Sequence, residues 1–129
     1  MINTGNLVNS SEIYGSTVSD SLSNGQNLNL QAPSSTNAYY ILKSAILTNT
    51  NANLDVQVRC SLTHYNPAPP GELQTAYLLK DAWVPAGTSL IVINESNMVY
   101  LFQRLQMITS VLTGNDLDVV YKYDYIICT

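Results

Sequence analysis

Charged side chains are scarce in this sequence. Five Lys and Arg residues and nine Asp and Glu residues make up 11% of the 129 residues, against about 25% in an average globular protein. The net charge is −4, and the five cations are scattered along the chain. Because a protein needs clustered Lys and Arg to neutralise a phosphate backbone, this composition argues against nucleic acid as a partner.

Long apolar runs are also missing. No apolar stretch approaches the roughly 20 residues of a membrane-spanning helix, so we expect no membrane partner. The first residues contain neither a basic nor an apolar region, and we expect no secretion signal. Neutral polar residues are abundant instead, with 14 Asn, 13 Ser and 11 Thr. Hydrophobic residues, at 46%, are enough to form the core of one domain.

Residues with distinctive chemistry are few. His64 is the single histidine and no Gly-x-Ser-x-Gly motif accompanies it, so nothing indicates a serine hydrolase. Cys60 and Cys128 lie too far apart for the close pairs of a zinc site. They form either a disulfide or two reduced thiols, and the lack of a secretion signal favours thiols. We therefore expect no enzymatic activity and no cofactor.

Two carboxylates flank Leu117. Asp116 and Asp118 are either a site for a hard cation or solvated residues at the start of a strand. The second interpretation is favoured, because an EF-hand loop needs further ligands, a central Gly and a distal Glu that do not follow. The six glycines never adopt the Gly-x-Gly-x-x-Gly spacing of a phosphate loop. The sequence predicts no metal site and no bound phosphate.

The composition of the chain changes near residue 38. Residues 1–38 contain no Lys or Arg, and their apolar residues are isolated among Asn, Ser, Thr and Gly. Such a segment does not bury enough apolar surface to order itself. It is either a flexible terminus or an extended arm that orders on a neighbouring subunit, and the recurring apolar residues favour the arm. The candidate contact residues of this arm are Leu7, Ile13, Leu22, Leu28 and Leu30.

Residues 39–129 are expected to form one β-sandwich domain. From Leu54 to Thr63 apolar and polar residues alternate, which is typical of a strand with one face in a core. About seven strands with turn signals between them predict an all-β fold, an antiparallel sandwich of Ig-like or jelly-roll-like type. The predicted strands span residues 39–48, 54–63, 75–83, 89–93, 98–102, 105–111 and 117–127.

Tyrosine is the dominant aromatic residue, with nine copies beside one Trp and one Phe. Tyr121, Tyr123 and Tyr125 share a face with apolar residues, which favours a place in the core. Tyr39, Tyr40, Tyr65 and Trp83 are the better candidates for exposure. Exposed rings of this kind serve protein interfaces or sugar binding, and the protein interface is favoured.

Several runs of the body, in this order, resemble small β-sandwich virion proteins of tailed bacteriophages. The resemblance covers residues 39–127 and leaves the predicted arm out. Its motifs are structural and carry no catalytic residues. The runs are Tyr40–Asn49, Leu54–Val58, Ala76–Lys80, Val84–Ile93 (VPAGTSLIVI) and Gly114–Tyr123 (GNDLDVVYKY).

The resemblance implies a non-enzymatic structural protein present in many copies in a phage particle. We expect a capsid decoration or cement protein, or a neck or tail accessory protein, made in the cytoplasm of the host bacterium. Its expected partners are other virion proteins and further copies of itself. A carbohydrate-binding host-attachment module is the alternative. If residues 1–38 are an arm, their deletion leaves the body folded but weakens incorporation into the particle.

Overall fold

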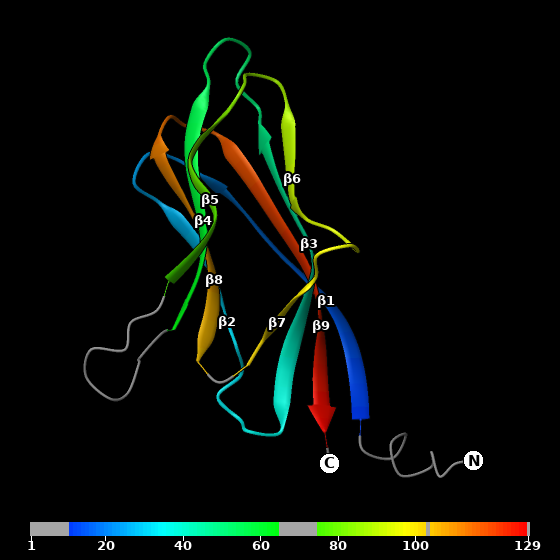
Figure 1. Ribbon diagram of the computed structural model, residues 1–129. Coiled ribbons are helices and arrows are strands. Elements are labelled where there is room, and N and C mark those ends of the chain that lie inside the picture. The colour runs from blue at the N-terminus through cyan, green and yellow to red at the C-terminus, as the bar shows by residue number, and fades with distance from the viewer. Residues whose placement is uncertain (1–10, 65–74, 103, 129) are drawn as a thin grey trace.

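Nine β-strands make up most of the structure. The computed structural model describes residues 11–64, 75–102 and 104–128, and every regular element in these ranges is a strand (Figure 1). Within the same ranges no helix is long and apolar enough to cross a membrane. The strands are β1 (Ser11–Leu22), β2 (Asn27–Gln31), β3 (Ala38–Asn49), β4 (Val56–His64), β5 (Thr75–Val84), β6 (Ser89–Ile93), β7 (Val99–Leu101), β8 (Leu105–Thr113) and β9 (Leu117–Cys128).

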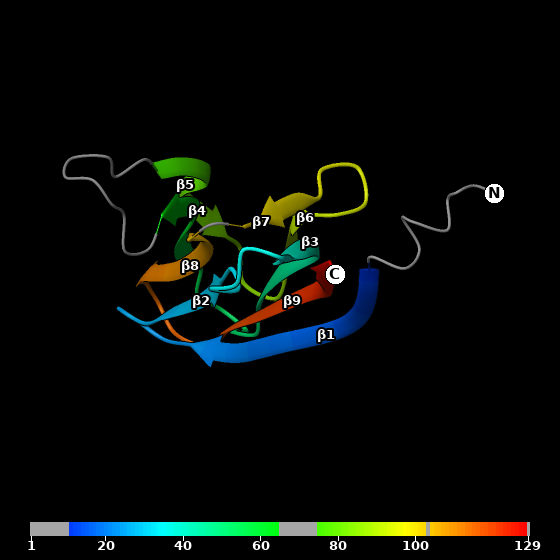
Figure 2. The ribbon, with the colours of Figure 1, turned by 90° about the horizontal axis from the view of Figure 1, so that it is seen from below.

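The strands form two antiparallel sheets that pack face to face (Figure 2). The first sheet has the order β1-β9-β3-β6, with β7 also paired to β3, and the second has the order β2-β8-β4-β5. The chain passes from the first sheet to the second between β1 and β2, and again between β3 and β4. This order is that of a jelly roll, a double-sheet architecture of two Greek keys. The predicted all-β antiparallel sandwich is confirmed, in its jelly-roll form.

The seven strands predicted after residue 38 are all present, with small shifts of their ends. The alternation in β4 places Val58 and Cys60 in the core, where both are fully buried. Tyr121 of β9 is also fully buried, as predicted. Its hydroxyl forms hydrogen bonds with Thr109 and with the carbonyl of Leu28, so the core contains no unpaired phenol at this point. Burial raises the pKa of Tyr121.

The segment predicted to be an arm forms two strands of the sandwich. β1 pairs with β9 along all 12 of its residues, and β2 pairs with β8. The core includes Leu22 and Leu30. The domain boundary predicted between residues 38 and 39 is therefore wrong for residues 11–38, while residues 1–10 lie outside the described residues. Isolated apolar residues are sufficient here because an edge strand of a sandwich buries alternate side chains on one face only.

A buried asparagine ties the turn after β3 to the end of β5. The side chain of Asn49 is fully buried, and its amide donates hydrogen bonds to the carbonyls of Leu54 at 2.8 Å and Val84 at 2.9 Å. Its side-chain oxygen accepts hydrogen bonds from the backbone N–H and the side-chain amide of Asn51, at 2.9 and 2.8 Å. Because burial of an unpaired amide is costly, these bonds hold the turn in one conformation.

Candidate functional site

An apolar band crosses the outer face of the first sheet near the C-terminal end of β9. The strand register places Ile13 of β1 opposite Ile126 of β9, and Ile126 opposite Tyr39 of β3. The ring of Tyr39 stacks on that of Tyr100 in β7, with centroids 5.9 Å apart and an interplanar angle of 14°. Ile126 is 5% exposed, whereas Ile13 and Tyr100 are 65% and 51% exposed. These four residues, the apolar band, are covered in the middle and open at both ends.

An aromatic hollow of about 340 Å³ adjoins the β7 end of the apolar band. Its walls come from the turn before β3, from β7 and from the last residues of β9. Phe102, which follows β7, is 50% exposed at its rim. The lining of the aromatic hollow is Ser35, Thr36, Asn37, Ala38, Tyr39, Tyr100, Phe102 and Cys128.

Several polar groups in the wall of the aromatic hollow are bonded to one another. The side-chain amide of Asn37 donates to the carbonyl of Cys128 at 3.0 Å, and the backbone N–H of Cys128 donates to the carbonyl of Asn37 at 2.7 Å. The hydroxyl of Ser35 donates to the side-chain oxygen of Asn37. What the hollow offers to a binding partner is therefore mainly the faces and edges of the aromatic rings.

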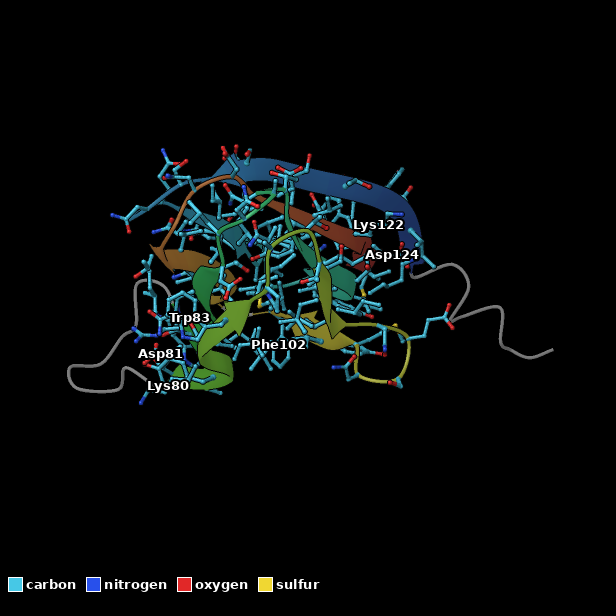
Figure 3. All side chains as sticks on the ribbon, turned by 90° about the horizontal axis from the view of Figure 1, so that it is seen from above. Lys80, Asp81, Trp83, Phe102, Lys122 and Asp124 are labelled. Carbon is cyan, nitrogen blue, oxygen red and sulfur yellow. The ribbon has the colours of Figure 1, made fainter. Side chains whose placement is uncertain are left out.

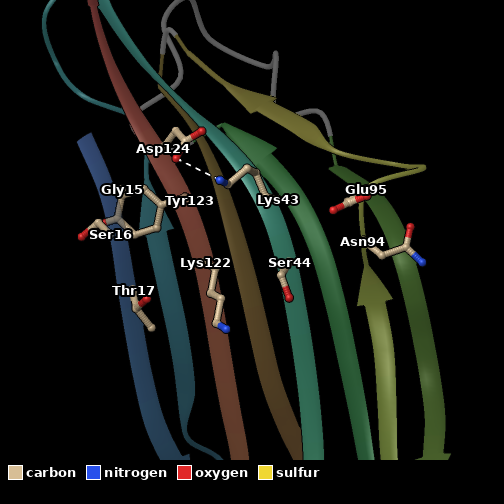
Figure 4. A pocket seen from close by; sticks show the side chains of 10 residues that line it. All are labelled: Gly15, Ser16, Thr17, Lys43, Ser44, Asn94, Glu95, Lys122, Tyr123 and Asp124. Carbon is tan, nitrogen blue, oxygen red and sulfur yellow. Dashed lines mark ion pairs between the residues drawn. The ribbon is translucent and has the colours of Figure 1, made fainter. Parts of the chain in front are cut away.

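A polar groove of about 530 Å³ lies on the same outer face, one step along the strands from the apolar band. Lys43 and Asp124 form an ion pair of 3.1 Å at one side of the polar groove, while Lys122 and Glu95 extend from β9 and from the turn after β6 (Figure 4). Hydroxyl groups of β1 complete its wall. This arrangement can bind a polar ligand, but it contains no nucleophile with a neighbouring base.

The free edges of the two sheets differ in how they are protected. Edge strands that natural proteins leave exposed are usually short, charged or bulged, because a bare edge pairs with other chains. The edge strand β5 is bulged and charged. Its pairing with β4 shifts register, and Asp81 adopts a positive φ of 55°. Arg59 donates from Nε to Asp81 at 3.0 Å. Lys80 and Asp81 lie together on this edge (Figure 3).

The edge of β1 is neither short nor bulged, and its two charged residues, Glu12 and Asp20, lie near its ends. It is 12 residues long, its register with β9 runs without a shift, and no charged residue lies between Glu12 and Asp20. The edges formed by β2 and β6 are only five residues long, and that of β7 is three. Among the described strands β1 is thus the long and regular edge with an uncharged middle, and Ile13 of the apolar band lies on it beside Glu12.

The structure separates the predicted contact residues into groups. Ile13 and Tyr39 lie on either side of Ile126 in the apolar band. Trp83 is 53% exposed, but it lies on β5 in the other sheet. Three predicted residues face the protein interior, where Leu22 and Leu30 are buried and Leu28 is half-buried against the core. Leu7 and Tyr65 lie outside the described residues.

Three residues of this surface could not be identified from the sequence as contact residues. Tyr100 and Phe102 lie in a predicted strand, yet nothing in their local pattern indicates which face is open. By alternation, Ile126 falls on the face of the last strand that also carries Lys122 and Asp124. The signal that identifies them is the pairing of β9 with both β1 and β3, which the sequence does not disclose.

The other chemical candidates occupy separate places. Asp116, with a φ of 59°, lies in the turn before β9, and Asp118 is exposed on β9. His64 ends β4, and its Nδ1 is buried without a hydrogen-bond partner among the described residues. In the ranges 11–64, 75–102 and 104–128 no three His, Cys, Asp or Glu side chains gather as metal ligands. Cys60 and Cys128 are both free thiols.

The two thiols are expected to differ in reactivity. Cys60 is fully buried, its Sγ lies 3.4 Å from the Thr109 hydroxyl, and burial raises its pKa to about 11. Since the thiolate is the reactive form, Cys60 stays protonated and unreactive at pH 8, while the partly exposed Cys128 reacts. Mass spectrometry after iodoacetamide treatment should count one modified thiol in the native protein and two in denaturant. Two rapid modifications in the native protein would contradict the burial of Cys60.

Comparisons with known proteins find only distant structural similarity. No protein-family model matches the chain, and no curated protein is significantly similar to it in sequence. A chain of the infectious bursal disease virus particle is 10% identical, with a TM-score of 0.46, and the match covers 92% of this chain and 31% of that one. The VP2 protein of the same virus, in T=1 particles, is 12% identical, with a TM-score of 0.44 and coverage of 92% and 32%.

A third similar structure comes from Bacillus endospore appendages, described as a family of disulfide-linked pili. It is 13% identical, with a TM-score of 0.41, and the match covers 92% of this chain and 89% of that one. The present chain spans about a third of the length of the viral chains. The similar structures are thus subunits of viral particles and of a pilus. At this level of similarity, the function has to be argued from the surface itself.

Proposed function

We propose that this protein is a non-enzymatic structural subunit of a virion, present in many copies and bound to neighbouring virion proteins. The observation that supports this function best is the combination of the unprotected β1 edge with the apolar band and the aromatic hollow. The resemblance of residues 39–127 to virion proteins of tailed bacteriophages supports the same role. We place the protein on the capsid as a decoration or cement protein, or at the neck or tail as an accessory protein.

The energetics favour association through this surface. Complete burial of an Ile, Tyr or Phe side chain is worth about 1.5–3 kcal/mol, and Ile13, Tyr100 and Phe102 are each at least half exposed. One such contact is weak, but many copies on a particle add their contacts through multivalency. No member of the apolar band is charged, so binding through it depends little on salt.

The virion assignment predicts that the protein purifies with the particle. Particles of the phage that encodes it, banded on a density gradient at low and at high salt, should retain the protein in many copies at both. The double variant Tyr100→Ser, Phe102→Ser should reduce its occupancy at least tenfold, because both exposed rings of the aromatic hollow are lost. Trp83→Ser is the matched control, an exposed aromatic on the other sheet, and should not reduce it. Particles without the protein, as measured by mass spectrometry, would overturn the proposal.

Carbohydrate binding is a second candidate, supported by the polar groove beside the exposed tyrosines of the apolar band. Hydroxyl, Lys and carboxylate groups next to an aromatic ring are the mixture that sugar sites use. A glycan array probed with the purified protein separates the two functions. Binding that Lys122→Ala abolishes would assign host attachment to this protein, whereas an empty array leaves the structural role.

A further inference from the structure

We propose that the β1 edge of one copy, with Ile13 at its centre of contact, docks in the aromatic hollow of the next copy. The copies then associate head to tail, into a ring or a filament. This inference rests on the proposed structural function and names one of its partners as the protein itself. The two exposed ends of the apolar band lie on opposite edges of one sheet, so each end is open to contact with another copy.

The two ends of the apolar band differ in shape. At the β1 edge Ile13 is an exposed apolar side chain on a regular strand, 65% open to solvent. At the β7 edge the band ends in a depression of about 340 Å³, with Tyr100 and Phe102 at its wall. A protruding group at one edge and a concave one at the other are complementary to each other. Contact between two different surfaces of one protein is heterologous, and repeated contacts of this type close into rings or continue as filaments.

The chemistry of the aromatic hollow favours an apolar side chain over a sugar. Directional recognition of sugar hydroxyls requires free hydrogen-bonding groups, whereas Ser35, Asn37 and the backbone of Cys128 already bond to one another. The ring faces and edges that remain exposed gain most from contact with aliphatic groups. The volume is at the lower end of the range for small-molecule sites, about 300–1,000 Å³, and accommodates side chains rather than a whole domain.

The backbone of β1 supplies a second element of the contact. Within the described residues, β1 pairs only with β9 and β7 pairs only with β3, so each has an unpaired side. Addition of a strand at a sheet edge contributes main-chain hydrogen bonds, while side chains in pockets provide specificity. In this scheme Ile13 is the specific side chain and the bare edge around it is the strand that is added. Glu12 is the charged residue nearest to Ile13 in β1, and the lining of the aromatic hollow contains no charged side chain that would repel it.

Two variants with complementary defects test the head-to-tail contact. Ile13→Asp removes the protruding group and keeps the aromatic hollow, whereas Phe102→Asp damages the hollow and keeps the β1 edge. Sedimentation of the full-length protein up to about 1 mM, the range of weak contacts, should show concentration-dependent oligomers. Each variant alone should stay monomeric, because each retains only one half of the contact. An equimolar mixture should form a one-to-one dimer that grows no further, because each variant supplies the half that the other lacks.

Controls separate this result from misfolding and from other interfaces. Ile13 and Phe102 are both at least half exposed, so circular dichroism and thermal melting should remain those of the wild type. Trp83→Asp should oligomerise like the wild type. A mixture that stays monomeric, or single variants that still oligomerise, would overturn the inference. A monomeric wild type that nevertheless occupies particles would also overturn it but leave the proposed virion function intact, whereas absence from particles would overturn both.

Discussion

Removing residues 1–38 is expected to leave a polypeptide that does not fold. The deletion takes away β1, an outer strand of the first sheet, and β2, an outer strand of the second. β9 would lose its 12-residue pairing with β1, and β8 would lose its pairing with β2. The buried core leucines Leu22 and Leu30 would leave as well, and loss of a single buried Leu side chain commonly costs about 2–5 kcal/mol. Because whole domains are stable by only about 5–15 kcal/mol, the combined loss exceeds what the fold tolerates.

Far-UV circular dichroism and chemical denaturation of the 39–129 fragment measure this directly. We expect no cooperative transition and no dispersed amide signals by NMR. The control is deletion of residues 1–10 alone, which retains all nine described strands and should retain cooperative unfolding. A 39–129 fragment that unfolds cooperatively would restore the interpretation of the first 38 residues as an arm.

Replacing Asn49 by alanine is expected to destabilise the protein by about 3 kcal/mol. The mutation removes the four side-chain hydrogen bonds of Asn49 and leaves the carbonyls of Leu54 and Val84 without this donor. Each buried polar group left unpaired costs about 1–3 kcal/mol, and the missing side chain also leaves a cavity. For a chain of this length the melting temperature should fall by roughly 10 °C.

Asn53→Ala is the matched control for this mutation, because Asn53 is an exposed amide in the same turn. Its effect on the denaturation midpoint should stay within about 0.5 kcal/mol, the range for surface substitutions. Equal effects of the two mutations would show that the buried amide does not organise the turn.

Most of the fold could be predicted from the sequence, because strand alternation is a local signal. The alternating residues of β4 and β9 identify both strands, and Cys60 and Tyr121 are buried as predicted. The buried faces are identified only in part, because Leu54 is exposed and Ile126, on the other face of β9, is buried. The choice between an Ig-like and a jelly-roll sandwich could not be made. It depends on which strands pair across long stretches of sequence, and no local periodicity encodes that.

The first two strands were missed for a different physical reason. β1 has few apolar residues, and Glu12 to Thr17 are exposed on both of its faces. Its stability comes from backbone hydrogen bonds to β9 and from Leu22 at its end, and composition does not report such bonds. Between Glu12 and Asp20 the strand also has no charged residue, so the middle of its edge is without that protection.

The candidate surface could be predicted only in part. Ile13 and Tyr39 are among the residues singled out from the sequence, whereas Tyr100, Phe102 and Ile126 are recognised only from the register of four strands. Spacing along the chain does not bring residues 13, 39, 100 and 126 together. Their meeting follows from the central position of β9, which pairs with β1 on one side and β3 on the other.

The position of β9 also has a consequence for biosynthesis. β9 is the last of the nine strands to leave the ribosome, yet the first sheet cannot close without it. Until β9 emerges, β1 and β3 have no strand between them. The pairing of β1 with β9 joins residues from the two ends of the described sequence. Contacts of such separation form slowly. Pairing of the first sheet therefore has to await the synthesis of β9, and until then the side of β1 that β9 later covers has no partner strand.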